Sequence, residues 1–319
     1  MKKYKAPNPA VFFILILALV SCRSESDSSS YSPDFSSSEI MEHIQLLSSD
    51  EMNGRLAGSP GEAKAAAYIA GLFDRFGLIP ASLEGRFYQF FELEGPMVQA
   101  AKMERHMSRN VLGYVRGGEY PQRWIVIGAH FDGQGTGGFI SMDGGNTSIH
   151  KSADDNASGV AGLLELAHYY SANPADYSIL FIAFSGEELG LLGSRYFIES
   201  DVLDQDAILA MINLDMIGRL EEGALTISGV ETGPFWEKSI QRANRDSISI
   251  ETMPTGAGAS DHIPFKEAGI PAIHYFTGLH EDYHRSSDTV EKIDSEGILK
   301  ILNHISNLVK ELSSESLIN

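Results

Sequence analysis

Two adjacent glutamates follow the most apolar segment in the middle of the chain. Residues 179–184 (ILFIAF) predict a strand buried on both faces, and Ser185-Gly186 predicts a turn, so Glu187 and Glu188 stand at a strand end. In an open α/β sheet, ligands bind in the crevice beyond the carboxyl ends of the strands. One glutamate could bind a cation there while the other faces a water on that cation. The alternative is an acidic first turn of a helix over 189–197, which carboxylates also favour.

Other segments place a histidine or an aspartate where a predicted element ends or begins. Residues 124–129 predict a buried strand, 157–170 a helix, and 208–214 and 272–276 two further strands. The metal-capable residues near these boundaries are His130, Asp154, Asp155, Asp215 and His284. A single such residue is more often a cap or a hydrogen-bonding group. Several carboxylates at one sheet edge would repel each other, so their convergence predicts a bound cation.

Composition limits the kind of metal and the kind of partner. The chain of 319 residues has one cysteine, Cys22, which excludes a disulfide framework and a cysteine-based metal site. Mixed histidine and carboxylate ligands suit zinc, or less selectively cobalt and manganese. The 24 basic and 43 acidic residues give a net charge of -19, which argues against a nucleic-acid partner. The sequence contains no information on oligomeric state.

The elements that must position these residues alternate between strand and helix patterns. Ser59-Pro60-Gly61-Glu62 predicts a helix start, followed by an apolar face up to Phe76, and Ser36 with Glu39 predicts a capping box for a short first helix. Such alternation predicts a three-layer α/β sandwich with a mostly parallel or mixed central sheet and helices on both faces. Residues 131–153, rich in Gly and Ser, predict a long loop above the sheet. Further helices are predicted at 234–243 and 295–312, and further strands at 86–94, 110–115, 224–228 and 247–252, the first two of them exposed or at an edge.

The first residues have the layout of an export signal. Three lysines within residues 2–5 precede the purely apolar run Val11 to Val20, which as a helix of about 15 Å is too short to span a bilayer of roughly 30 Å. Leu19-Val20-Ser21-Cys22 resembles the lipobox of bacterial lipoproteins, in which cleavage precedes an acylated cysteine. Several acyl chains anchor a protein stably to a membrane. The alternative is an ordinary cleaved signal with an incidental cysteine.

These signals divide the chain into three parts. Residues 1–22 are the expected lipoprotein signal and lipobox, and 23–38, rich in serine and acidic residues, are expected to be a disordered linker. Residues 39–319 are the expected catalytic domain. A lipidated Cys22 would place this domain in the cell envelope of a bacterium, at the periplasmic face or the cell surface.

The motifs between Glu39 and Leu312 resemble those of the co-catalytic zinc exopeptidases typified by leucine-type aminopeptidases, with glutaminyl cyclases as relatives. They occur in the order found in that family, as HFD, ADDNASG, SGEELG, NLDMIGR, SDHIPF and EDYHRSSDT. The resemblance implies two zinc ions per chain and peptide substrates. It implies that His130 and Asp215 hold one zinc, that Glu188 and His284 hold the second, that Asp155 bridges them, and that Glu187 is the general base.

Such a set of residues fits hydrolysis. Two cations about 3.5–4 Å apart can share a water, lower its pKa and hold a peptide carbonyl oxygen. Glu187 would then take the proton of that water and pass it to the departing amine. The resemblance favours Asp155 over Asp154, because the family ligand precedes Gly by four positions. Asp132, Asp261 and Asp288 are candidates to orient the ligands, with helix capping as the alternative.

A tetrahedral intermediate also needs a donor beyond the metals. Some family members have a tyrosine three residues before the SDH motif, but Ala257 stands at that position here. Others have a tyrosine immediately before the last histidine ligand, which makes Tyr283 the candidate, with packing at the pocket rim as its alternative. The other histidines, including His274, are expected to be surface or core residues.

Four functions compete. An aminopeptidase that hydrolyses the N-terminal peptide bond leads, and a glutaminyl-peptide cyclotransferase or a carboxypeptidase on the same fold are the alternatives. A non-enzymatic binding module would require lost ligands, and none is lost.

Overall fold

The computed structural model describes Met1 and residues 34–314, apart from 104–106, 146 and 256–257. The signal, Cys22 and the first part of the predicted linker lie outside these residues, as does Ala257. Helix α1 (Ser37–Leu47) begins within the stretch assigned to the linker, because Ser36 accepts a hydrogen bond from the backbone N–H of Glu39 and caps it. The ordered domain therefore starts slightly earlier than position 39. None of the helices in the described ranges combines the length and the apolar character that a membrane span requires.

The described strands form one mixed sheet with nine strands in the order β1-β3-β5-β4-β6-β9-β7-β8, with β2 paired to β3 beside β1. The central strands β5, β4, β6 and β9 run parallel, and β3 and β7 flank them antiparallel. The strands are β1 (Ile79–Pro80), β2 (Tyr88–Glu92), β3 (Met107–Val115), β4 (Tyr120–His130), β5 (Tyr177–Phe184), β6 (Ile208–Leu214), β7 (Leu225–Ser228), β8 (Ile250–Met253) and β9 (Ala272–Phe276).

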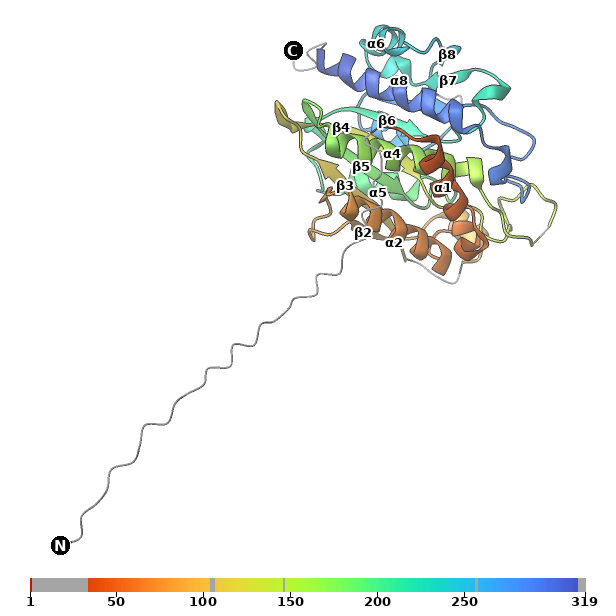
Figure 1. Ribbon diagram of the computed structural model, residues 1–319. Coiled ribbons are helices and arrows are strands. Elements are labelled where there is room, and N and C mark those ends of the chain that lie inside the picture. Colours follow the sequence, from red (N-terminus) through yellow and green to blue (C-terminus); the bar gives the residue numbers. More distant parts are fainter. Residues whose placement is uncertain (2–33, 104–106, 146, 256–257, 315–319) are drawn as a thin grey trace. The chain divides into compact units, whose positions relative to one another are not determined.

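Helices cover both faces of the sheet. Helix α4 (Gly159–Ala172) packs on β3, β4, β5 and β6, and α1, α2 (Pro60–Arg75) and α8 (Ser295–Ser314) pack beside it (Figure 1). Helices α5 (Leu192–Glu199) and α7 (His262–Glu267) pack against the sheet elsewhere, and α6 (Trp236–Ala243) packs on α8. A short helix, α3 (Pro96–Ala100), completes the set. The predicted three-layer α/β sandwich is confirmed.

The apolar patterns explain this burial. Every residue of β5 and of β6 is buried, as expected for strands covered on both faces. Phe197 of α5 and Phe265 of α7 pack with Phe184 in one cluster beneath the sheet. Each such side chain contributes about 1.5–3 kcal/mol when it is fully buried.

Two local predictions differ from the structure. Strand β3 is internal, because it pairs with β5 on one side and with β1 and β2 on the other. Helix α5 begins at Leu192 and not at 189, since Leu191 has a left-handed backbone (φ 62°) that ends the preceding turn. Glu187 and Glu188 therefore lie in a turn and not in the first turn of a helix. The short helices α3 and α7 were not predicted.

Candidate metal centre

Four neighbouring parallel strands bring the predicted ligands to one edge of the sheet. Strand β4 lies between β5 and β6, and β9 lies on the other side of β6. All but one of these ligands follow the carboxyl end of a strand, as expected for a site in this type of sheet. His130 ends β4, Glu187 and Glu188 follow β5, Asp215 follows β6, His284 lies in the loop after β9, and Asp155 lies in the helical turn Ala153–Ser158 before α4.

Asp155 lies between the two histidines. Its Oδ1 is 3.4 Å from Nε2 of His130, and its Oδ2 is 3.4 Å from Nε2 of His284. Oδ2 is buried and has no hydrogen-bond partner among the residues that the structure describes. A carboxylate whose two oxygens face two imidazoles has the geometry of a bridging ligand.

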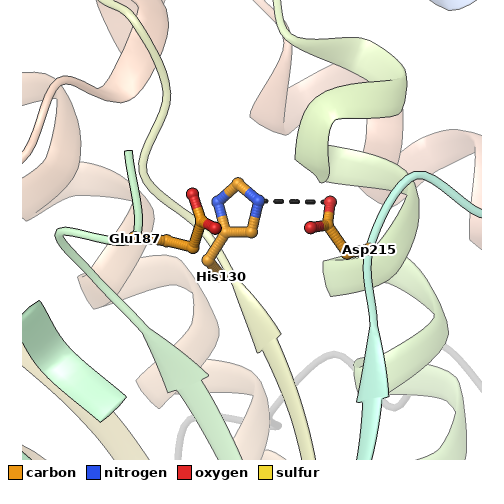
Figure 2. Close-up of side chains that lie close together, drawn as sticks. All are labelled: His130, Glu187 and Asp215. Atoms are coloured by element: carbon orange, nitrogen blue, oxygen red, sulfur yellow. Dashed lines mark hydrogen bonds and ion pairs between the residues drawn. The ribbon is translucent and has the colours of Figure 1, made fainter. Parts of the chain in front are cut away.

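The remaining donors gather in two groups around this carboxylate. Ligand atoms of His130, Glu187 and Asp215 lie within 4.8 Å of one another, as do those of Asp155, Glu188 and His284. In the first group, Nε2 of His130 is 3.3 Å from Oδ1 of Asp215, and Glu187 lies on the other side of the ring (Figure 2). In the second, Nε2 of His284 is 3.3 Å from Oε2 of Glu188. The structure brings together all six residues that the motifs singled out.

Crowding and burial change the proton affinities of these groups. Burial raises the pKa of Glu187 well above its usual value, and Asp215 adds to this against the opposing effect of His130. Burial and the charge of Asp155 raise the pKa of Glu188 to about 8. Burial alone would lower the pKa of His284, but Asp155 and Glu188 raise it to about 9. Without a cation, the centre therefore retains protons that its ligands must release when a metal binds.

The centre fits divalent cations held by nitrogen and oxygen. The Nδ1–H of His284 donates to the carbonyl of Ile140 at 3.0 Å, so the lone pair of Nε2 faces Asp155 and Glu188. Such a bond from the other ring nitrogen is typical of histidines that ligate metals. Two imidazoles and four carboxylates without sulfur match zinc. The residues therefore fit zinc.

Two of the three predicted orienting aspartates contact the centre. Asp132 Oδ1 is 3.6 Å from Nδ1 of His130 and accepts a hydrogen bond from the backbone N–H of Glu187 at 3.2 Å. Asp288 accepts hydrogen bonds from the backbone N–H groups of Asp154 and Asp155 at 2.9–3.1 Å. Asp261 is also buried, but no hydrogen bond links it to a predicted ligand within the described part of the chain. It does not make a capping bond to α7 either.

Asp154 binds elsewhere, in agreement with the choice of Asp155. Its Oδ1 accepts a hydrogen bond from the backbone N–H of Gly218 at 2.7 Å, and its Oδ2 is 3.1 Å from Nε2 of His280. Both oxygens of Asp154 are thus occupied away from the two histidines. The residue fastens the turn before α4 to the segment after β6.

The long loop 131–153 holds the second histidine. The backbone N–H of Met142 donates to the carbonyl of His284 at 2.9 Å. Asp143 Oδ2 accepts a hydrogen bond from the backbone N–H of Ser286 at 2.8 Å, and Arg285 lies 3.7 Å from Oδ1. His284 itself has a left-handed backbone, with φ 55°. These contacts fix a residue that lies far from the end of β9.

A cavity of about 500 Å³ opens next to the centre. Tyr283 lines it and stacks on His284, with ring centroids 3.8 Å apart. Burial, together with Asp155 and Glu188, raises the pKa of Tyr283, so its hydroxyl stays protonated and can donate. His274, expected to be a surface or core residue, is buried and also lines the cavity. The other walls are mainly apolar, from Met216, Met253, Ala259, Phe276 and Leu279.

Sequence analysis missed two buried polar residues at the centre. Gln134 Nε2 donates to Oε1 of Glu188 at 2.5 Å. Arg55 is fully buried and donates to the carbonyls of Phe131 and Ser152. Neither residue stands at the end of a strand or a helix with an apolar period, so the pattern analysis had no signal for them. The Asn-Gly-Arg turn that contains Arg55 is the one local feature that could have drawn notice.

A three-layer sandwich with paired histidines and carboxylates at the carboxyl edge of its sheet defines a metallopeptidase class. The chain belongs to peptidase family M28, whose sequence profile matches residues 110–309. The resemblance drawn from the motifs is thereby confirmed.

Individual relatives agree with this assignment. Aminopeptidase YwaD of Bacillus subtilis is 33% identical over 207 residues, which cover 59% of this chain and 41% of that protein. Leupeptin-inactivating enzyme 1 of Streptomyces exfoliatus is 27% identical over 267 residues, which cover 82% of this chain and 53% of that protein. The chain spans about half the length of these relatives.

Solved structures share the fold. The zinc aminopeptidase BSAP of Bacillus subtilis matches with a TM-score of 0.68 at 20% identity, over 88% of this chain and 96% of that one. A glutaminyl cyclase of Bacteroides thetaiotaomicron bound to N-acetylhistamine matches with a TM-score of 0.72 at 20% identity, over 88% and 99%. At this identity the similarity establishes the fold and not the reaction.

Proposed function

We propose that this chain is a zinc-dependent aminopeptidase that hydrolyses the N-terminal peptide bond of peptides and holds two metal ions. The placement of Asp155 between His130 and His284 carries the proposal, because one carboxylate facing two imidazoles suits a pair of cations. Family membership and the match to aminopeptidase YwaD support it. His130 and Asp215 would hold one ion, and Glu188 and His284 the other.

Glu187 is the general base of the proposed reaction. When bound, the two cations would polarise the scissile carbonyl and lower the pKa of the attacking water. Glu187 lies beside His130 and takes the proton of that water, then passes it to the leaving amine. Asp132 fixes the backbone of Glu187 while this happens. The hydroxyl of Tyr283, on the cavity wall, donates to the oxygen of the tetrahedral carbon.

Glutaminyl cyclisation is the second candidate, because solved glutaminyl cyclases share the fold over nearly their full length. A carboxypeptidase is the third, since a glutamate carboxypeptidase 2 homolog of Caenorhabditis briggsae is 31% identical over 203 residues. A panel of aminoacyl arylamides, glutaminyl peptides and N-terminally blocked peptides separates the three. The proposal expects arylamide hydrolysis that a chelator abolishes and zinc restores. Cyclised product, or shortening of blocked peptides from the carboxyl end, would contradict it.

We also propose that the chain is a lipoprotein anchored in the bacterial cell envelope through Cys22. The support is the sequence alone: a basic start, an apolar run of residues 11–20 and the only cysteine directly after Leu-Val-Ser. An anchored enzyme with a serine-rich tether would act on peptides that reach the envelope.

A further inference from the structure

Arg55 is a fully buried cation whose donors all bind backbone carbonyls. Its Nε donates to Phe131 at 2.8 Å, and its Nη1 donates to Leu47 at 2.5 Å and to Lys151 at 3.2 Å. Its Nη2 donates to Ser152 at 2.9 Å. It forms no ion pair with a carboxylate of the described residues, which is unusual for a buried arginine. All three guanidinium nitrogens therefore join backbone segments, through four hydrogen bonds.

The segments that Arg55 joins carry the metal ligands. Phe131 stands between His130 and Asp132, the residue that holds the backbone of Glu187. Lys151 and Ser152 lead directly into the turn that presents Asp155. The Arg55 side chain thus connects the backbone next to His130 with the backbone that leads to Asp155.

The backbone around Arg55 reinforces the same junction. The carbonyls of Gly54 and Arg55 accept hydrogen bonds from the N–H groups of Gly135 and Gly133 at 2.9 and 3.2 Å. Gly54 has φ +69°, and a Cβ there would meet the carbonyl oxygen of Gly135 at 2.2 Å. Only glycine permits this close approach, so the turn that contains Arg55 can pack directly against residues 133–135.

Arg55 remains a cation in this position. Burial lowers its pKa to about 10, and the nearby carboxylates of Asp132 and Asp155 oppose this effect. A neutral side chain of similar size could not serve four carbonyls, and lysine could not reproduce the planar arrangement of donors.

We propose that Arg55 is a positioning residue that preorganises the metal centre, by fixing the His130 segment against the Asp155 segment before metal binds. This inference rests on the metal centre proposed above. Ligands held in place lose less entropy on binding, and loss of an outer partner of a metal site typically costs 10–100-fold in affinity.

The test is a zinc titration of the full chain and of Arg55→Lys, with a competing chelator to set free zinc. Arg55→Lys keeps the positive charge and loses the fork, so its zinc dissociation constant should rise about 10–100-fold. The visible spectrum of the cobalt-loaded variant should also change, because the spectrum reports ligand geometry. Leu308→Ala is the control, since it opens a cavity in the buried face of α8 without touching the centre.

Each possible result either supports or overturns the inference on Arg55. A lower unfolding temperature in both variants, with weaker zinc binding only in Arg55→Lys, supports the inference. Equal zinc affinity and an unchanged cobalt spectrum in Arg55→Lys overturn it. If Arg55→Lys folds only with zinc, the zinc dependence of folding gives the constant. Failure to fold at any zinc concentration also overturns it, because Arg55 would then hold the whole fold. A wild-type chain that binds no zinc would instead overturn the proposed function.

Discussion

The carboxylate of Asp132 accepts a hydrogen bond from the backbone N–H of Glu187 at 3.2 Å. Asp132 also lies 3.6 Å from Nδ1 of His130, so one buried side chain connects a proposed metal ligand with the proposed general base. The turn after β5 is thereby fixed relative to the end of β4. This connection would keep the proposed base aligned beside the centre.

Replacing Glu187 by Gln should lower turnover by orders of magnitude and leave the metals in place. The amide is nearly isosteric but cannot accept a proton, so kcat should fall by about 10²–10⁴. Zinc content per chain and kcat for an aminoacyl arylamide are the measurements. Glu199→Gln, at an exposed position of α5, is the matched control and should behave as wild type. Unchanged turnover in Glu187→Gln would remove Glu187 from its role.

Replacing Asp143 by Ala should weaken the second metal group selectively. The change removes the acceptor for the N–H of Ser286 and frees the segment that holds His284. We expect one of the two zinc ions to bind about 10–100-fold more weakly. Asp143→Asn keeps an acceptor oxygen and should recover much of the affinity. Equal loss of both ions, or of neither, would show that this contact does not act on His284.

The metal-free protein should lose stability as the pH rises from about 6 to 9. The folded-state pKa of Glu188 is about 8 against 4.5 for the free group, and that of His284 is about 9 against 6.5. The folded chain therefore binds more protons than the unfolded chain in this range, and its free energy of unfolding falls with pH, by up to about 5 kcal/mol for the two groups together.

Urea unfolding of chelator-treated protein at pH 6 and pH 9 measures this change. Zinc should reverse the trend, because it binds ionised Glu188 and neutral His284 and so stabilises more as the pH rises. A metal-free protein that is more stable at pH 9 would contradict the proton affinities described for the centre.

Replacing Cys22 by Ser should release the protein from membranes. The substitution removes the thiol that acylation requires and leaves residues 39–319 unchanged. Fractionation of bacterial cells that express the full chain, with arylamide hydrolysis as the readout, should move the activity from the membrane to the soluble fraction. Persistent membrane association of Cys22→Ser would argue against lipidation.

Much of the fold could be predicted because apolar periods mark buried strands. The predicted strands at 208–214 and 272–276 coincide with β6 and β9. Parallel strands end at one edge, so the residues after them could be expected to meet. The interior position of β3 could not be predicted in this way, since its pattern does not say which strands pair with it.

The centre was predictable as far as its ligands follow strands or motifs. Asp155 and His284 required the family motifs, because neither directly follows a strand. Arg55 escaped notice because its partners are backbone carbonyls, which every residue has. Gln134 lies in a loop without periodicity, where contacts depend on tertiary structure alone. Residues that hold the backbone and the ligands of a site in place are therefore the ones that sequence patterns reveal least.

Zinc counting in the wild-type chain and in Asp155→Ala tests the central claim most directly. Asp155 faces both histidines, so its loss should remove a ligand from each ion. Two zinc ions per wild-type chain and almost none in Asp155→Ala, with Asp74→Ala on the exposed face of α2 still holding two, is the predicted result. An Asp155→Ala chain that retains two zinc ions would contradict the account.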